Sequence, residues 1–211
     1  MSHTEKAQER KNRILDTAFR IFIEKKIESV SMGEITETAG NGRAMLFRYY
    51  PTKLDLVIAV CTKGWKENLD ELDRTRPISS VVEIPAIGRL IFTLDSYIEM
   101  YRDYKDLLCF NDNFNHYVSH EVCSKERLEE FHAVLYSVDT RLHMMYEKAK
   151  EDRTFWTDIP EEEFMRVTVP TMMTDCAYYA GGFVWESEKD GDYLQALVTS
   201  TPNRKRPSSL G

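Results

Sequence analysis

The sequence is short of residues that interrupt or cross-link a chain, with 9 glycines, 7 prolines and 4 cysteines among 211 residues. So few helix breakers favour long helices over many short strands. The cysteines are scattered without a Cys-x-x-Cys pair, which argues against a disulfide framework or a structural zinc site. No apolar run approaches membrane-spanning length, and the first residues hold no apolar stretch of signal-peptide type. We therefore expect a cytoplasmic, all-α protein without a membrane partner.

Signatures of common enzymes are also missing. The chain contains no Gly-rich phosphate loop, no Gly-x-Ser-x-Gly elbow and no local cue for a catalytic cysteine. Pairs of possible metal ligands do share helix faces: Asp112 with His116, His116 with His120, Glu129 with His132, and Asp139 with His143. A helical di-iron site needs a second Glu-x-x-His motif, and the other pairs need ligands from other helices. We expect solvated helix-face pairs, with no metal, no cofactor and no catalytic residues.

Charge is unevenly distributed along the chain. The formal net charge is −7, yet residues 1–55 hold ten Lys and Arg against eight Asp and Glu. The acidic excess lies entirely in the remaining residues. A slightly basic N-terminal segment followed by an acidic remainder is typical of a protein that binds a polyanion through its N-terminal part.

The first fifty residues predict three short helices. Residues 10–25 carry apolar side chains at helical spacing. Ser31 and Glu34 form a capping box that begins a second helix, and Gly40 can end it in a left-handed conformation. A third helix is expected over residues 43–50. Two helices separated by so short a turn are the arrangement of a helix-turn-helix.

Longer helical patterns follow. Thr52 and Asp55 form another capping box, which begins a helix running to about Leu72. After a linker that contains proline and serine, we expect helices over residues 86–102, 103–118, 124–150, 161–186 and 193–199. The expected domains are a helix-turn-helix domain over residues 1–53, a helical bundle over residues 54–201 and a flexible polar tail over residues 202–211.

The start of the third helix has side chains suited to base edges. In a helix-turn-helix, the N-terminal residues of this helix enter the major groove. Arg43 can donate two hydrogen bonds to a guanine, Ala44 permits close approach, and Met45 can touch a thymine methyl.

Other residues near this helix are suited to the phosphate backbone. Arg48 and Lys53 bring charge, and Tyr49 brings a hydroxyl donor. Ser31 offers a hydroxyl at the start of the second helix, where a phosphate is also favoured. Such short basic-aromatic helices also occur as ordinary surface helices, so this alternative stays open at the level of the motif.

The segments RILDTAFRIFIEK, SMGEITETAG and GRAMLFRYYPTKLDLVIAV resemble the N-terminal domain of TetR (tetracycline-repressor-type) transcriptional regulators. The resemblance runs through residues 10–60 without a gap. In this chain Lys26 stands where the family usually has glycine, Asn41-Gly42 replaces an aliphatic-serine turn, and Phe47 replaces a tyrosine. The resemblance implies that DNA is contacted by Ser31, Arg43, Ala44, Met45, Phe47, Arg48, Tyr49 and Lys53.

The resemblance also implies a homodimer formed through the last two long helices. Residues 171–185 are the candidate segment, because Gly181 and Gly182 allow close helix approach and aromatic residues favour interfaces. The candidate interface consists of Tyr178, Tyr179, Gly181, Gly182, Phe183 and Trp185. The alternative is that the two glycines mark only a kink.

A small-molecule effector within the C-terminal domain is a further implication of the resemblance. Methionine and aromatic side chains adapt to irregular apolar ligands, so we expect an apolar or aromatic effector. The candidate pocket residues are Trp65, Phe92, Tyr97, Phe110, Phe114, Met144, Met172 and Cys176. The same residues at helical spacing also fit an ordinary core.

Three functions therefore remain to be weighed. The first is a homodimeric repressor that an effector releases from a pseudo-palindromic double-stranded DNA operator. The second is an all-α enzyme or metal carrier with merely structural N-terminal helices. The third is a helix-turn-helix protein that binds other proteins. The resemblance favours the first.

Overall fold

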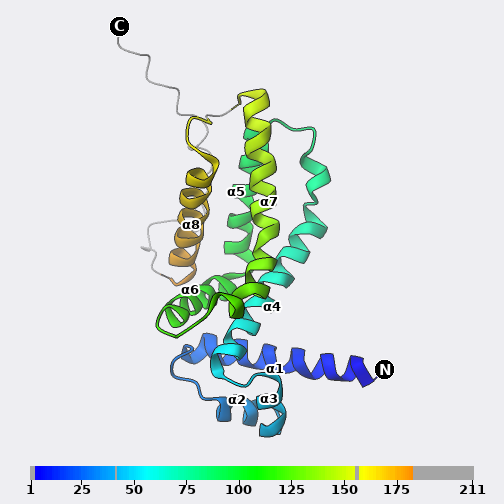
Figure 1. The fold of residues 1–211 in the computed structure, drawn as a ribbon, viewed down its shortest axis with the longest axis vertical. Helices are drawn as coiled ribbons and strands as arrows, with labels where there is room; N and C mark the ends of the chain where they lie inside the picture. Colours follow the sequence, from blue (N-terminus) through cyan, green and yellow to red (C-terminus); the bar gives the residue numbers. More distant parts are fainter. Residues whose placement is uncertain (1–2, 41, 155–156, 183–211) are drawn as a thin grey trace. The chain divides into compact units, whose positions relative to one another are not determined.

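The computed structural model describes residues 3–40, 42–154 and 157–182. Within these ranges the chain is helical and contains no strand, which confirms the predicted all-α class. The α-helices are α1 His3–Lys25, α2 Met32–Ala39, α3 Arg43–Tyr49, α4 Lys53–Thr75, α5 Ala86–Asp103, α6 Lys105–Ser119, α7 Glu129–Asp152 and α8 Glu161–Ala180 (Figure 1). Two 3₁₀ helices, η1 Ile78–Val81 and η2 Lys125–Leu128, precede α5 and α7.

These helices form two compact units. The first comprises residues 1–70 and 109–135, and the second comprises residues 71–108 and 136–211, as far as each is described. The helices α4, α6 and α7 each contribute to both units along their length. The domain boundaries predicted from the sequence remain predictions. None of the helices in the described ranges is long and apolar enough to cross a membrane.

The core of the first unit forms where α1 packs on α2 and α2 on α3. Ile14, Phe22 and Ile35 are completely buried there, as the helical spacing predicts. The Phe110 ring of α6 adds to this core, with its centroid 5.3 Å from that of Phe19 and 6.1 Å from that of Phe22. Burial of each such side chain stabilises the fold by roughly 1.5–3 kcal/mol.

Local hydrogen bonds explain where α2 and α4 begin. Ser31 Oγ accepts a hydrogen bond from the Glu34 backbone N–H at 3.2 Å. The Glu34 carboxylate forms an ion pair with Lys25 Nζ at 2.6 Å, which joins α1 to α2. At the start of α4 the capping box is reciprocal, because Thr52 N–H donates to Asp55 Oδ2 and Asp55 N–H donates to Thr52 Oγ1.

Left-handed backbone marks the turns of the N-terminal helices. Gly40 ends α2 at φ +61°, as the sequence predicts, and its N–H donates to the Glu37 carbonyl. Lys26, directly after α1, lies at φ +63°. Glycine adopts this conformation without strain, whereas lysine does not. The residue before α3, Gly42, has no side chain with which to cap the helix.

The second unit is built around α5 and α8, which pack against each other. Leu90, Leu94 and Ile98 of α5 are buried at helical spacing. The predicted linker before α5 contains the 3₁₀ helix η1, which was not predicted from the sequence. The helix predicted over residues 161–186 is observed to Ala180. Its end, the helix expected over 193–199 and the tail lie outside the described residues.

Candidate nucleic-acid interface

Helix α3 has two different faces. Leu46 is 1% exposed and Tyr50, directly after the helix, is also buried. Arg43, Ala44, Phe47 and Arg48 are exposed. One side of the helix therefore completes the core, while the other presents two guanidinium groups to its surroundings.

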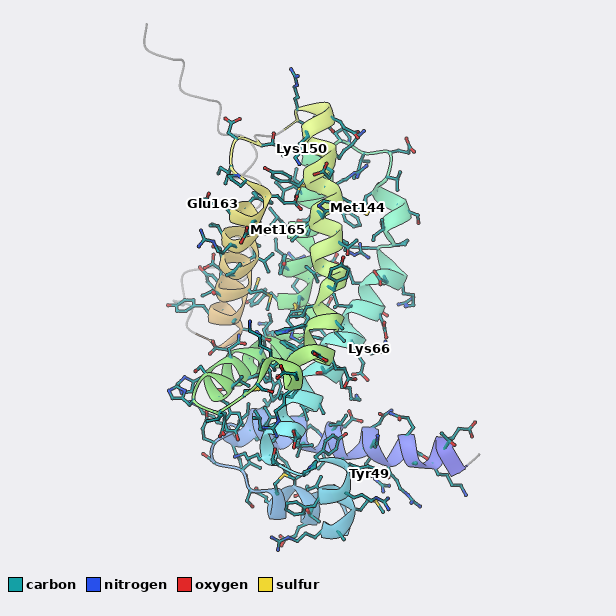
Figure 2. The ribbon with its side chains drawn as sticks, in the orientation of Figure 1. Tyr49, Lys66, Met144, Lys150, Glu163 and Met165 are labelled. Carbon is teal, nitrogen blue, oxygen red and sulfur yellow. The ribbon has the colours of Figure 1, made fainter. Side chains whose placement is uncertain are left out.

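Tyr49 and Tyr50 are neighbours in the sequence but differ in how deeply their side chains are buried. Burial raises the pKa of Tyr50 to about 12, with smaller contributions from Glu130 and Tyr49. The Tyr50 hydroxyl therefore stays protonated within the core. Tyr49, labelled in Figure 2, is only partly buried, so its ring can pack while its edge remains accessible.

The exposed side chains of α3 pack on one another. The guanidinium of Arg43 lies 5.6 Å from the centre of the Phe47 ring, and that of Arg48 lies 5.2 Å from the centre of the Tyr49 ring. Cation–π contacts of this kind restrict the side chains without neutralising their charge. The arginines thus remain electrostatically available to a phosphate or a base edge.

Lys11 of α1 is a further cation near α3, which the sequence motifs did not predict. Its Nζ lies 5.2 Å from the centre of the Tyr49 ring, on which Arg48 also packs. The signal in the sequence was the basic run Arg10-Lys11 at the start of the first predicted helix. The contact itself joins residues 38 positions apart, which helical spacing does not reveal.

Ser31 and Lys53 lie at the starts of α2 and α4. Ser31 is exposed, and its hydroxyl can still donate a hydrogen bond while its oxygen caps α2. Lys53 is less free, because its Nζ donates to the Glu28 carbonyl at 3.2 Å and lies 5.5 Å from the Tyr117 ring centre. Burial lowers the pKa of Lys53, although Glu28 and Glu121 oppose the shift.

The predicted effector residues divide between the two units. In the first unit Trp65, Phe110 and Phe114 are buried. Trp65 Nε1 donates to Asn111 Oδ1 at 3.0 Å, and the Phe114 ring centre lies 5.1 Å from that of Phe131. Phe110 packs on Phe19 and Phe22, as described above. All three residues therefore have the contacts of ordinary core residues.

In the second unit Phe92 and Met144 line a small, partly open hollow with Ile78, Val81, Val82, Arg89, Thr93 and Arg141. Arg89 is only 9% exposed. Its guanidinium donates to the carbonyls of Ile84 and Met144, at 3.1 and 3.3 Å, and to that of Val82. The acceptors of all these hydrogen bonds are uncharged backbone oxygens. These bonds therefore do not neutralise the positive charge of Arg89.

Three other predicted effector residues, Tyr97, Met172 and Cys176, are buried in the second unit. Cys176 Sγ lies 3.5 Å from the Tyr97 carbonyl oxygen. Burial, and secondarily Asp175, raises the pKa of the Cys176 thiol to about 12. Cys176 is therefore a protonated packing residue rather than a nucleophile.

The predicted dimer residues lie at the end of α8 and beyond it. Tyr178 is 51% exposed, whereas the Tyr179 ring packs 6.5 Å from that of Tyr101. Gly181 and Gly182 are exposed, with Gly182 at φ +80°. Phe183 and Trp185 lie outside the described residues.

Comparison with known proteins adds to this geometry. The family model of bacterial regulatory proteins of the tetR family matches residues 14–60. The HTH-type transcriptional regulator AcrR of Shigella flexneri is 33% identical over 69 residues, covering 33% of this chain and 32% of AcrR. An uncharacterised HTH-type regulator of Mycobacterium tuberculosis is 35% identical over 92 residues, covering 44% of each chain. The chain thus spans less than half the length of these curated relatives, which are named as transcriptional regulators rather than enzymes.

Solved structures share the fold over most of the chain. FadR of Bacillus subtilis, in complex with stearoyl-CoA, has a TM-score of 0.66 at 13% identity, covering 89% of this chain and 93% of FadR. A tetR-family regulatory protein from Rhodococcus RHA1 has a TM-score of 0.64 at 15% identity, covering 94% and 93%. The predicted fold, an N-terminal helix-turn-helix with a C-terminal helical domain, is therefore confirmed.

Proposed function

We propose that this chain is a regulator of the TetR family, and specifically a cytoplasmic homodimeric repressor that a small-molecule effector releases from a pseudo-palindromic operator. The single observation that supports DNA binding most strongly is the two-faced α3. Its buried residues fix the helix to the core, while Arg43, Ala44 and Arg48 are exposed on it.

On DNA, α3 would enter the major groove with its first turn leading. Arg43 donates two hydrogen bonds to a guanine there, Ala44 allows the backbone to approach, and Met45 touches a thymine methyl. The ring of Phe47 supports the Arg43 guanidinium rather than donating a hydrogen bond.

The phosphate contacts surround this helix. Arg48 and Tyr49 supply them from α3, and Lys11 adds a charge from α1. The Ser31 hydroxyl supplies a donor at the start of α2. Lys53 contributes when its ammonium leaves the Glu28 carbonyl.

A dimer presents two such helices to one duplex. Half-sites about 34–36 Å apart, or a multiple of this spacing, follow from the two-fold symmetry. We place the dimer interface at Tyr178, Tyr179, Gly181, Gly182, Phe183 and Trp185. Exposed apolar side chains of α8, Val167 and Tyr178, support an interface along this helix.

The effector site that we favour is the hollow of the second unit lined by Phe92 and Met144. Its walls are largely apolar, and two arginines line it. Arg141 is paired with Asp73, so the cation that we assign to the effector is Arg89, whose hydrogen bonds described above go to backbone carbonyls. We therefore expect an apolar effector that also carries an anionic group. Tyr97, Met172 and Cys176 are buried in the same unit but do not line this hollow, and Trp65, Phe110 and Phe114 lie in the core of the first unit. Stearoyl-CoA, with which FadR of Bacillus subtilis was solved, is a suitable first probe.

Binding of the purified, ligand-stripped chain to DNA across a salt series tests the proposal. A selection from random duplexes supplies the binding site, and fluorescence anisotropy supplies the affinity. We expect a log–log salt slope near −5, which corresponds to about six phosphates at roughly −0.9 each. Lys11→Ala removes one phosphate contact from each protomer, so it should make the slope of the dimer about 1.8 less steep, whereas Lys66→Ala, which removes an exposed lysine elsewhere, should leave it unchanged. Failure to select any sequence would contradict the proposal.

A further inference from the structure

A cluster of possible metal ligands lies between the C-terminal half of α7 and the first residue of α8. We propose that His143, Glu147 and Glu161 bind a divalent transition-metal ion of the zinc, cobalt or nickel type. The ion would join the two helices across the connection at residues 153–160. This inference concerns a site in the second unit and goes beyond operator binding and the apolar effector.

The geometry brings three donor atoms together. His143 and Glu147 lie four residues apart on one face of α7. His143 Nδ1 lies 2.7 Å from Glu161 Oε1 at the start of α8. One donor atom from each of the three residues lies within 4.8 Å of the others. Bonds of about 2.0–2.2 Å to a common ion need donor atoms roughly 3–3.5 Å apart, so small side-chain rotations suffice.

Two of the four helix-face pairs noted in the sequence can be compared here: the pair that contains His143, and the pair His116 and His120. A pair of ligands on one helix needs a third from elsewhere, and Glu161 supplies it for His143. His116 and His120 have ring centroids 4.5 Å apart, but His120 Nδ1 is engaged by the His116 carbonyl at 2.8 Å. Among the described residues, only the His143 cluster brings three such donors together.

The ligand types indicate the class of metal. Imidazole with carboxylates suits zinc and its first-row neighbours, whereas calcium and magnesium prefer oxygen ligands alone. Three protein ligands leave at least one position for water. All three side chains are exposed or half-buried, so an ion can enter without unfolding the unit.

Lys150 occupies part of the site at present. Its Nζ lies 2.6 Å from Glu147 Oε1 and 5.2 Å from the centre of the Tyr146 ring (Lys150 is labelled in Figure 2). The hydrogen bond to Glu147 raises the pKa of Lys150, and Glu161 adds a smaller contribution. A metal ion must displace this ammonium from Glu147, so Lys150 is a competitor whose removal should tighten binding.

Titration of the metal-stripped full chain with Zn²⁺ in a calorimeter tests the site, and Co²⁺ absorption reports its ligands. We expect one ion per chain at micromolar affinity and a rise in the melting temperature. His143→Ala and Glu161→Gln should each weaken binding at least tenfold, whereas Lys150→Met should strengthen it severalfold. The double variant His116→Ala/His120→Ala is the control and should bind as the wild type does.

Other outcomes would overturn the proposal. They are wild-type affinity weaker than millimolar, unchanged binding by His143→Ala, loss of binding in the His116/His120 control, or a Co²⁺ spectrum with a thiolate charge-transfer band. Operator binding by the same variants is measured separately and does not decide this question.

Discussion

The conformation of Arg43 separates its proposed role from that of a general phosphate contact. Its guanidinium packs over the Phe47 ring at the first turn of α3, which holds the planar fork in place without using its hydrogen-bond donors for an acidic partner. A fork of this kind reads guanine by two parallel hydrogen bonds, whereas a lysine ammonium provides only a point charge.

We predict that Arg43→Ala relaxes the base preference at one position of each half-site. The loss of discrimination should be about 1–3 kcal/mol. Arg43→Lys should retain much of the non-specific affinity but lose most of the discrimination. Anisotropy titrations against the selected operator and its single-base variants measure both. Equal losses on every sequence would show instead that Arg43 contacts only phosphate.

Lys26 is one of two residues other than glycine, with Arg153, whose backbone is left-handed in the described part of the chain. It lies at φ +63° directly after α1, at the position where the sequence resemblance led us to expect glycine. We predict that Lys26→Gly raises the free energy of unfolding by about 0.5–1 kcal/mol, because the left-handed strain exceeds the entropy that glycine adds to the unfolded chain.

Lys26→Ala is the matched control for this prediction. Alanine removes the same charged side chain but keeps the Cβ that causes the strain, so its stability should stay close to that of the wild type. Urea denaturation of the three chains measures the difference. Equal stabilisation by glycine and alanine would assign the effect to the lysine charge rather than to the backbone.

At the scale of one element, the start of α4 combines a local cap with a long-range ion pair. Burial alone would raise the pKa of Asp55, but hydrogen bonds from Thr52 and Arg127 outweigh it and leave the pKa below its usual value of 3.8. Arg127 Nη2 lies 2.7 Å from Asp55 Oδ1, which joins η2 to this helix.

The sign of the resulting pH dependence follows from the lowered pKa. Because the folded state binds the Asp55 proton more weakly than the unfolded state, the stabilisation is complete above the unfolded pKa and is lost as the pH falls below it. We predict a smaller loss of melting temperature between about pH 5 and pH 3 in Asp55→Asn than in the wild type. Arg127→Gln should fall between them. An identical pH profile for all three chains would contradict this account.

The same element shows how far a sequence alone can predict structure. The Thr52–Asp55 capping box was predictable because both partners lie within one turn. Arg127 was not, since it reaches Asp55 from 72 positions away. Likewise Ser31 capped α2 as predicted, but the Glu34 carboxylate turned to Lys25. Hydrogen-bond partners within a turn follow from spacing, whereas distant partners depend on how helices pack.

At the scale of the whole molecule, the burial pattern of α3, the proposed recognition helix, was more predictable than the location of the proposed effector site. The N-terminal helices carry specific local motifs, so the residues of α3 were placed on their faces from the sequence. The predicted effector residues share only size and apolarity. The structure gives Trp65, Phe110 and Phe114 to the first unit and Phe92 and Met144 to the second. Apolar character cannot distinguish a core residue from a pocket residue, because both are buried for the same physical reason.

Dimerisation is the property of the whole molecule that the proposed function most requires. Tyr178 of α8 is 51% exposed, although tyrosine contributes strongly to interfaces when it is buried. We predict that Tyr178→Lys raises the dimer dissociation constant at least tenfold, because the ammonium would be buried against an apolar partner surface. Operator affinity should fall in parallel at protein concentrations below that constant, since each half-site contact then loses its linked partner.

Tyr136→Lys provides the control for this prediction. Tyr136 belongs to α7 of the same unit and is 69% exposed. Tyr136→Lys therefore makes the same chemical change as Tyr178→Lys, but on α7 instead of α8. Sedimentation velocity across a concentration series measures both variants. Dissociation by Tyr178→Lys alone would support an interface along α8, whereas dissociation by Tyr136→Lys alone would move the interface to α7. If either variant weakens the dimer without any loss of operator affinity, one α3 is sufficient for binding. That result would contradict the proposal that a dimer binds a two-fold symmetric operator.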